Sequence, residues 1–146
     1  MSIEDDLYKE IILENYKSRK NKEARPDARY RSEGANPSCG DDLELFVDVE
    51  DGRISRITYE GMGCSICCAS ANLLCESLRG RSVEEAKRIV EKYRGMLLED
   101  QEPSFPPDIE DLEVMEGVKK YPVRIKCALL GWNTFQNIVK EMENEA

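Results

Sequence analysis

Two short runs of alternating residues, joined by Asp51-Gly52, constrain the fold of this chain most strongly. In "DLELFVDVE" apolar residues alternate with mostly polar ones, and "RISRITYE" is rich in β-branched residues. Such alternation is typical of strands with one buried face, and Asp-Gly favours a tight hairpin turn. The turn "GMGC" and an apolar segment over 66–78 follow. The sequence therefore predicts an antiparallel hairpin and then a buried helix that ends at Gly80.

Helices are predicted on both sides of this hairpin. Ser2 and Asp5 have the spacing of a capping box, and apolar residues recur at helical intervals over 3–18. The polar segment that follows is predicted to be a loop with a short edge strand near 28–34. A further amphipathic helix is predicted over 83–94.

Glycine and proline residues divide the C-terminal part of the chain. Gly95 is expected to end the helix before it, and the acidic, proline-interrupted stretch from Glu99 is expected to begin as an extended loop. The segment "DIEDLEVME" is predicted to return to helix. Tyr121-Pro122 breaks that helix, and the apolar periodicity after it predicts a last helix.

The order of these elements indicates an α+β fold. Two or three antiparallel strands are preceded and followed by helices but do not alternate with them, so the helices are expected to cover one face of a small sheet. The length of 146 residues suits one domain, residues 1–146.

Composition excludes several classes of function. No apolar run approaches the roughly 18 residues that a membrane span needs, and the acidic N-terminus does not resemble a signal peptide, so a cytoplasmic protein is expected. The net charge of −9 argues against a nucleic-acid partner. The sequence contains no histidine, so a bound metal is expected to use sulfur or carboxylate ligands.

Cysteine chemistry is the leading question, because in a reducing compartment thiols or metal ligands are more common than disulfides. Cys75 lies within the apolar helix and is predicted to pack in the core, and core packing is also favoured for Cys68. Cys64 and Cys67 form a C-x-x-C motif, but a thioredoxin-like pair would need a βαβ unit and a zinc ribbon would need a second motif.

The remaining cysteines lie at the edges of elements. Cys64 begins a helix, where free N–H groups stabilise a thiolate, although core packing is the alternative. Cys39 lies in the turn "NPSCGDD", and Asp41 can point to the same side, although a turn role would also explain this carboxylate. Cys127 follows Arg124 and Lys126 near a helix start, which favours a thiolate; core packing is again the alternative.

Together these residues offer three sulfur atoms and one oxygen atom. This ligand set suits tetrahedral Zn²⁺ or iron bridged by sulfide, if the three loops converge. The predicted site consists of Cys39, Asp41, Cys64 and Cys127.

Three stretches, "NPSCGDD", "GMGCSICCASAN" and "GVKKYPVRIKCALLGW", resemble the NifU-like, IscU/SufU family of iron–sulfur cluster assembly proteins. The resemblance implies a SufE/NifU-like fold and a Zn²⁺ ion or a [2Fe-2S] cluster at Cys39, Asp41, Cys64 and Cys127. It also implies sulfur transfer from a cysteine desulfurase, for which Cys127 is the expected acceptor. Recipient apo iron–sulfur proteins or downstream assembly proteins are the other expected partners.

The departures from the IscU pattern resemble the SufU type. Lys126 stands where IscU-type members carry histidine, and the long stretch between Cys64 and Cys127 resembles the SufU arrangement. Two functions follow from the resemblance: a scaffold for a nascent cluster, which we favour, or a zinc-dependent sulfurtransferase, which would make the protein an enzyme. A purely structural zinc site is the third alternative. Cys67 and Cys68 have no counterpart in the family pattern.

Overall fold

The structure is a computed structural model that describes the backbone of residues 3–145 and the side chains of residues 6–145. The predicted capping box of Ser2 and Asp5 lies outside the described side chains. The elements, in chain order, are α1 (Ile3–Lys17), β1 (Tyr30–Asn36), η1 (Pro37–Cys39), β2 (Asp41–Glu50), β3 (Arg53–Met62), α2 (Ser65–Leu78), α3 (Val83–Leu98), η2 (Pro107–Lys120), η3 (Pro122–Arg124) and α4 (Ile125–Glu145), where η denotes a 3₁₀ helix.

The three strands form one antiparallel sheet in the order β1-β2-β3. The predicted hairpin is confirmed: Asp51 and Gly52 have φ values of 53° and 74°, the left-handed conformation that a tight hairpin turn needs. The free edge of β3 is covered by the loop after α1, because Tyr59 exchanges backbone hydrogen bonds with Asn21 and Glu23. This pairing interrupts the row of unpaired backbone groups that an edge strand exposes.

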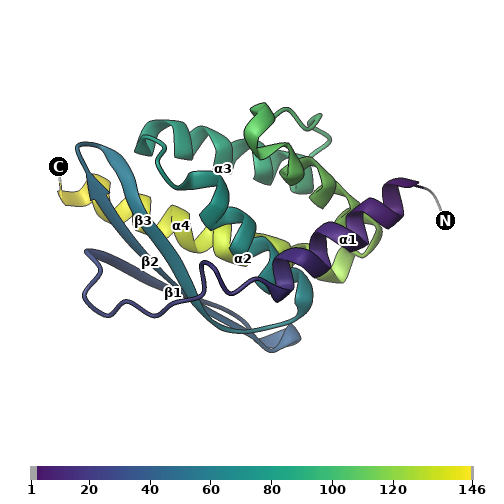
Figure 1. The fold of residues 1–146 in the computed structure, drawn as a ribbon, viewed down its shortest axis with the longest axis horizontal. Helices are drawn as coiled ribbons and strands as arrows, with labels where there is room; N and C mark the ends of the chain where they lie inside the picture. Colours follow the sequence, from purple (N-terminus) through teal and green to yellow (C-terminus); the bar gives the residue numbers. More distant parts are fainter. Residues whose placement is uncertain (1–2, 146) are drawn as a thin grey trace.

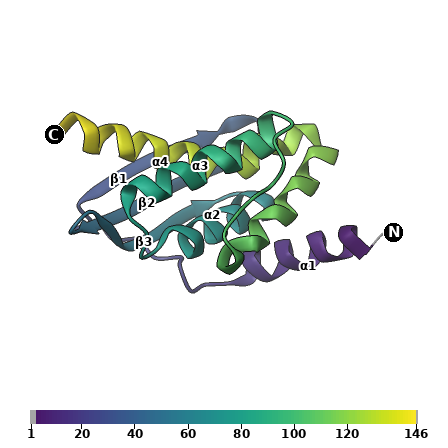
Figure 2. The same cartoon turned by 90° about the horizontal axis from the view of Figure 1, so that it is seen from above.

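Helices α2 and α4 lie on one face of the sheet, as predicted, with α4 along β1 and β2 (Figures 1 and 2). The close approach of α4 to β1 depends on Gly34, because a Cβ atom at that position would overlap Thr134 Oγ1 and lie 3.1 Å from Leu130 Cδ1. Leu43, Leu45 and Val47 of β2 point into the core beneath these helices. The two helices carry Cys64 and Cys127, so this packing places both near one end of the sheet.

We expect Gly34→Ala to destabilise the protein by about 1–3 kcal/mol, because the added methyl group must displace α4. Urea unfolding would measure the loss. The double variant Gly34→Ala/Thr134→Ala removes the overlapping oxygen, so it should recover part of the stability, whereas strictly additive losses would contradict this explanation.

The prediction that Gly95 ends the helix before it is wrong. Helix α3 continues through Gly95 to Leu98, and the backbone N–H of Glu99 still bonds to the Gly95 carbonyl. The glycine has a packing role instead, because a Cβ atom there would overlap the side chain of Gln101. The acidic loop follows, and "DIEDLEVME" is helical as predicted, although as the 3₁₀ segment η2.

Within the described residues, no helix is both long enough and apolar enough to cross a lipid bilayer.

Candidate metal centre

Four chain segments meet at one end of the sheet and carry the predicted site residues. Cys39 ends η1, Asp41 begins β2, Cys64 is the N-cap of α2, and Cys127 lies in the first turn of α4. Gly40, with φ of 71°, makes the turn that separates Cys39 from Asp41. The residues come from positions far apart in the sequence, so their proximity is a result of the tertiary fold.

Three of the four residues form a compact donor group. One ligand atom each from Cys39, Asp41 and Cys127 lies within 4.8 Å of the other two. In a tetrahedral zinc site with Zn–S bonds near 2.3 Å, two sulfur ligands are about 3.8 Å apart, so small side-chain adjustments suffice to hold an ion. The donor set of thiols and a carboxylate also suits zinc or iron, so these residues fit such a group.

The sulfur of Cys64 lies beside this group rather than within it. The backbone N–H of Cys64 donates to Asp41 Oδ1 at 2.9 Å, which fixes the carboxylate. Its Sγ accepts a hydrogen bond from the Cys67 N–H at 3.4 Å and is therefore turned over the first turn of α2. Cys64 is partly buried and interacts with the Cys127 thiol, so it lies at the edge of the donor group.

The electrostatics at Cys127 correct the prediction of a stabilised thiolate. Its exposed fraction is 0%, and burial, followed by Asp41, Cys39 and Cys64, raises the pKa of the Cys127 thiol. Arg124 hydrogen-bonds to Cys127, and this contact raises the pKa of the guanidinium. Its positive charge does not outweigh the effects that raise the pKa of the thiol. A cluster of acidic groups around a buried thiol favours a bound cation, which would convert the thiols into thiolates.

Residues 7–128 match the family model described as the NifU-like N terminal domain. The chain belongs to this family. It is 36% identical over 137 residues to the iron–sulfur cluster assembly scaffold protein IscU of Thermotoga maritima, covering 93% of this chain and 94% of that protein. It is also 32% identical over 139 residues to the zinc-dependent sulfurtransferase SufU of Bacillus subtilis, covering 95% and 93%.

Solved structures of NifU-like proteins share the fold. A putative iron–sulfur cluster assembly scaffold protein for the SUF system from Fervidobacterium islandicum AW-1 superposes with a TM-score of 0.81 at 30% identity, covering 91% of this chain and 96% of that one. A NifU-like protein from Brucella abortus gives 0.87 at 21% identity, covering 99% and 100%. The α+β prediction and the family resemblance are both confirmed.

In this NifU-like chain, Asn36 is a site residue that the sequence reasoning missed. It is 7% exposed, and its Nδ2 lies 3.5 Å from Asp41 Oδ2 and 3.7 Å from Cys127 Sγ. Ser38 Oγ donates to Asn36 Oδ1 at 3.0 Å and so orients the amide. Its position directly before "PSCGDD" could have indicated that Asn36 belongs to the site, but an Asn-Pro pair is equally typical of a turn.

The structure explains why the residue directly before Cys64, Gly63, is a glycine. A Cβ atom at this position would lie 2.8 Å from Asp41 Oδ1 and 3.2 Å from Cys67 Sγ. A side chain there would separate the turn from the carboxylate. The glycine therefore allows strand β2 and the start of α2 to approach closely.

The other three cysteines are buried in α2. Cys75 packs in the core as predicted, and burial raises its pKa to about 12. Cys68, also predicted to be buried, is 8% exposed and points its thiol at the Gly63 carbonyl, 3.7 Å away. Cys67 is 2% exposed, and burial, followed by Asp41, Cys68, Cys64 and Cys39, raises its pKa.

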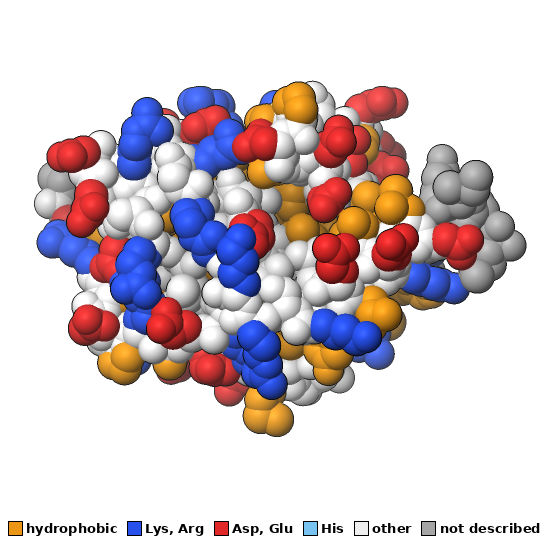
Figure 3. Space-filling view, viewed as in Figure 1, with side chains coloured by type: hydrophobic (Ala, Val, Ile, Leu, Met, Phe, Trp, Pro, Cys, Tyr) orange, Lys and Arg blue, Asp and Glu red, His pale blue; other side chains and the backbone are white. Residues whose placement is uncertain are grey.

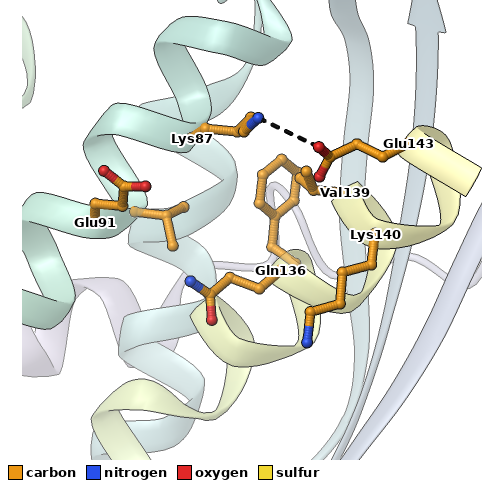
Figure 4. A pocket seen from close by; sticks show the side chains of 8 residues that line it. Lys87, Glu91, Gln136, Val139, Lys140 and Glu143 are labelled. Atoms are coloured by element: carbon orange, nitrogen blue, oxygen red, sulfur yellow. Dashed lines mark ion pairs between the residues drawn. The ribbon is translucent and has the colours of Figure 1, made fainter.

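A separate cavity of about 300 Å³ lies between α3 and α4, where Lys87 and Glu143 point toward one another and form an ion pair at 3.8 Å (Figure 4). Its α4 residues begin at Phe135, eight residues after Cys127 and therefore about 12 Å further along the helix. No cysteine lines it. This cavity is distinct from the donor group.

Proposed function

We propose that the chain, acting as one NifU-like unit over residues 1–146, takes up sulfur from a cysteine desulfurase and serves as the scaffold for a nascent [2Fe-2S] cluster. The observation that carries the proposal is the convergence of the Cys39, Asp41 and Cys127 donor atoms within 4.8 Å. Cys64, at the edge of this group, completes the proposed ligand set. Iron bridged by sulfide is held by such thiolates, and a carboxylate is a harder, weaker partner for that cluster than a fourth thiolate.

Sulfur uptake is a thiol exchange that needs no other reactant. The Cys127 sulfur attacks the outer sulfur of the desulfurase persulfide, a new S–S bond forms at Cys127, and the desulfurase cysteine leaves as a thiol. Because Cys127 has no exposed surface, we propose that the incoming persulfide passes between Cys39 and Cys64, which are partly buried.

Exposed apolar side chains around the site support a protein partner as the sulfur donor. Met62 and Val123 are 79% and 75% exposed, and the Val123 carbonyl contacts Cys39 Sγ at 3.9 Å. Tyr121, 46% exposed, lines an adjoining groove of about 450 Å³ together with Tyr8 and Ile66. On the face seen in Figure 3, charges of both signs are interspersed over the sheet and α3, and apolar side chains gather beside α1. Apolar surface next to a reactive site suits a transient protein contact.

A zinc-dependent sulfurtransferase is the second candidate function. The donor spacing suits tetrahedral zinc, and the similar SufU protein of Bacillus subtilis is named for this activity. Bound at these residues, zinc would hold the thiols as thiolates, and one of them would accept and pass on the sulfur.

Metal and acid-labile sulfide analysis of anaerobically purified protein separates the two functions. The variants Cys39→Ser, Cys64→Ser and Cys127→Ser are compared with Cys68→Ser, a buried cysteine outside the donor group. Iron and sulfide in equal amounts, lost only in the first three variants, support the scaffold. One zinc without sulfide supports the sulfurtransferase, and protein without bound metal in either form contradicts both.

Chelation tests the structural alternative. We expect the metal-free protein to keep its helical circular dichroism, because the apolar core joins the sheet to α1, α2, α3, η2 and α4, and Cys127 is one of many members of this cluster. The midpoint of thermal unfolding should fall only by the binding energy of the metal. Unfolding on chelation would instead indicate that the metal holds the domain together.

Asn36→Ala should weaken zinc binding by about 10- to 100-fold, because the amide orients Asp41 and contacts Cys127. Competition with a chromogenic zinc chelator measures the change. Ser38→Ala, which removes only the group that orients Asn36, should have a smaller effect; an Asn36 variant with unchanged affinity would exclude this positioning role.

A further inference from the structure

Cys64 and Cys67 are in contact at the first turn of α2. The Cys67 N–H donates to Cys64 Sγ at 3.4 Å, so the Cys64 sulfur lies directly over the turn that carries Cys67. Cys64 is the N-cap of α2, with an extended backbone, and Cys67 is the third residue of the helix, so the Cys64 side chain folds back toward Cys67 as in a capping interaction. A disulfide needs Cβ atoms about 3.5–4.5 Å apart, and the N-cap backbone, which lies outside the helix, would have to bring the two Cβ atoms into that range.

The Cys67 thiol faces the turn before the helix. A Cβ atom on Gly63 would lie 3.2 Å from Cys67 Sγ and 2.8 Å from Asp41 Oδ1, so the thiol and the carboxylate both border the space that a side chain at position 63 would occupy. Cys67 is 2% exposed and reaches the site from its inner side. Solvent therefore has little access to the Cys67 thiol, whereas a sulfur atom held on Cys64 can reach it.

Cys64 is also the member of the proposed ligand set whose sulfur lies outside the compact group of Cys39, Asp41 and Cys127. In the described conformation it accepts a hydrogen bond from the Cys67 N–H and also interacts with the Cys127 thiol. An anionic sulfur species on Cys64 would be stabilised there by the free N–H groups of the helix N-terminus. The Cys64 sulfur therefore lies between the Cys127 thiol and the turn that carries Cys67.

We propose that Cys67 is a resolving thiol that reduces sulfur carried on Cys64 to sulfide. The Cys67 sulfur attacks the Cys64 Sγ of a Cys64 persulfide, a Cys64–Cys67 disulfide forms, and the bond to the outer sulfur breaks. The outer sulfur leaves with the electron pair as hydrosulfide and takes the Cys67 proton to give H₂S. The outer sulfur gains two electrons, and the two cysteine sulfurs supply them.

This role rests on the proposed function, because it acts on sulfur that Cys127 has accepted: the Cys64 sulfur attacks the outer sulfur of the Cys127 persulfide, the new S–S bond forms at Cys64, and Cys127 is released as a thiol. It supplies sulfide, the oxidation state in which sulfur bridges iron in a cluster. A dithiol reductant of the thioredoxin class would then reduce the disulfide by thiol–disulfide exchange.

Cys68 provides a matched control. It is adjacent in sequence and 8% exposed, but its thiol points at the Gly63 carbonyl, and the Cys64 sulfur is hydrogen-bonded to the N–H of Cys67. Cys67→Ala and Cys68→Ala remove the same atom from neighbouring positions of one helix. Circular dichroism and thermal unfolding establish that both variants are folded, and Cys67→Ser provides a second test if alanine disturbs packing.

The experiment treats the full-length, metal-free chain anaerobically with one equivalent of inorganic polysulfide, removes the excess donor and adds no thiol. Intact mass distinguishes a persulfide, about 32 Da heavier, from a disulfide, about 2 Da lighter. Fragmentation of the tryptic peptide 57–79 locates the bond, and methylene blue formation measures released sulfide. We expect the unsubstituted chain and Cys68→Ala to form the Cys64–Cys67 disulfide. Cys67→Ala should retain the persulfide and release sulfide at least about 100-fold more slowly, because the attacking thiol is no longer held in place.

Three results would overturn the inference. If the unsubstituted chain and Cys67→Ala both keep the added sulfur, sulfur uptake stands and the resolving role fails. If the disulfide joins Cys64 to Cys68, the wrong thiol has been assigned. If no chain takes up sulfur, the proposed function fails as well, and oxidation with diamide followed by the same mapping then shows whether Cys64 and Cys67 pair at all.

Discussion

Replacing Cys127 by alanine is expected to reduce zinc affinity and sulfur uptake by more than about 100-fold while the protein remains folded. Cys127 is the donor that borders all the others: Asp41, Cys39 and Cys64 each interact with its thiol, and Asn36 contacts its sulfur. Losing a residue that orients a ligand already lowers affinity by about 10- to 100-fold, so losing a central ligand should have a larger effect. Isothermal titration with zinc and mass detection of the persulfide measure the two losses.

Cys75→Ala is the control for this prediction. Like Cys127, Cys75 is 0% exposed and lies on a helix, but it packs among apolar side chains away from the donor group. Its replacement should lower the free energy of unfolding by about 1–2 kcal/mol and leave zinc affinity unchanged. Equal zinc affinity in the Cys127 and Cys75 variants would mean that the donor group does not bind the metal.

Replacing Trp132 by alanine is expected to lower the free energy of unfolding by about 3–5 kcal/mol, the largest effect of any single core substitution proposed. The indole is 0% exposed and stacks on Tyr93 with ring centroids 3.9 Å apart. Its Nε1 donates to Ser70 Oγ at 2.9 Å, and Ser70 in turn donates to the Ala128 carbonyl at 2.6 Å. One side chain therefore joins α2, α3 and α4.

Urea denaturation followed by circular dichroism measures this loss. Trp132→Phe keeps most of the stacking area and removes the N–H donor, so it should lose less stability than the alanine variant. A loss below about 1 kcal/mol for Trp132→Ala would show that the three helices are held together by other contacts. Because a domain is stabilised by only about 5–15 kcal/mol in total, the expected loss removes a large share of the stability of the fold that brings Cys127 to the donor group.

Local patterns predicted the elements of the fold well, because their causes are local. The alternation in β2 and β3, the Asp51-Gly52 turn and the apolar character of α2 each express a preference that neighbouring residues satisfy among themselves. Gly95 shows the limit of this reasoning: a glycine in a helix signals an end when only the backbone is considered, whereas here it makes room for Gln101 from outside the helix.

The candidate site divides in the same way. The sequence by itself determined which residues carry donor atoms, and the order of the three motifs indicated the family, which the comparisons confirm. Only the tertiary structure decided that Cys39, Asp41 and Cys127 come together, that Asn36 joins them, and that Cys64 faces Cys67. It also raised the pKa of Cys127, where local charge predicted a stabilised thiolate. The physical reason is that proximity and burial depend on how α2 and α4 pack on the sheet, and that packing is set by contacts between core residues of different elements.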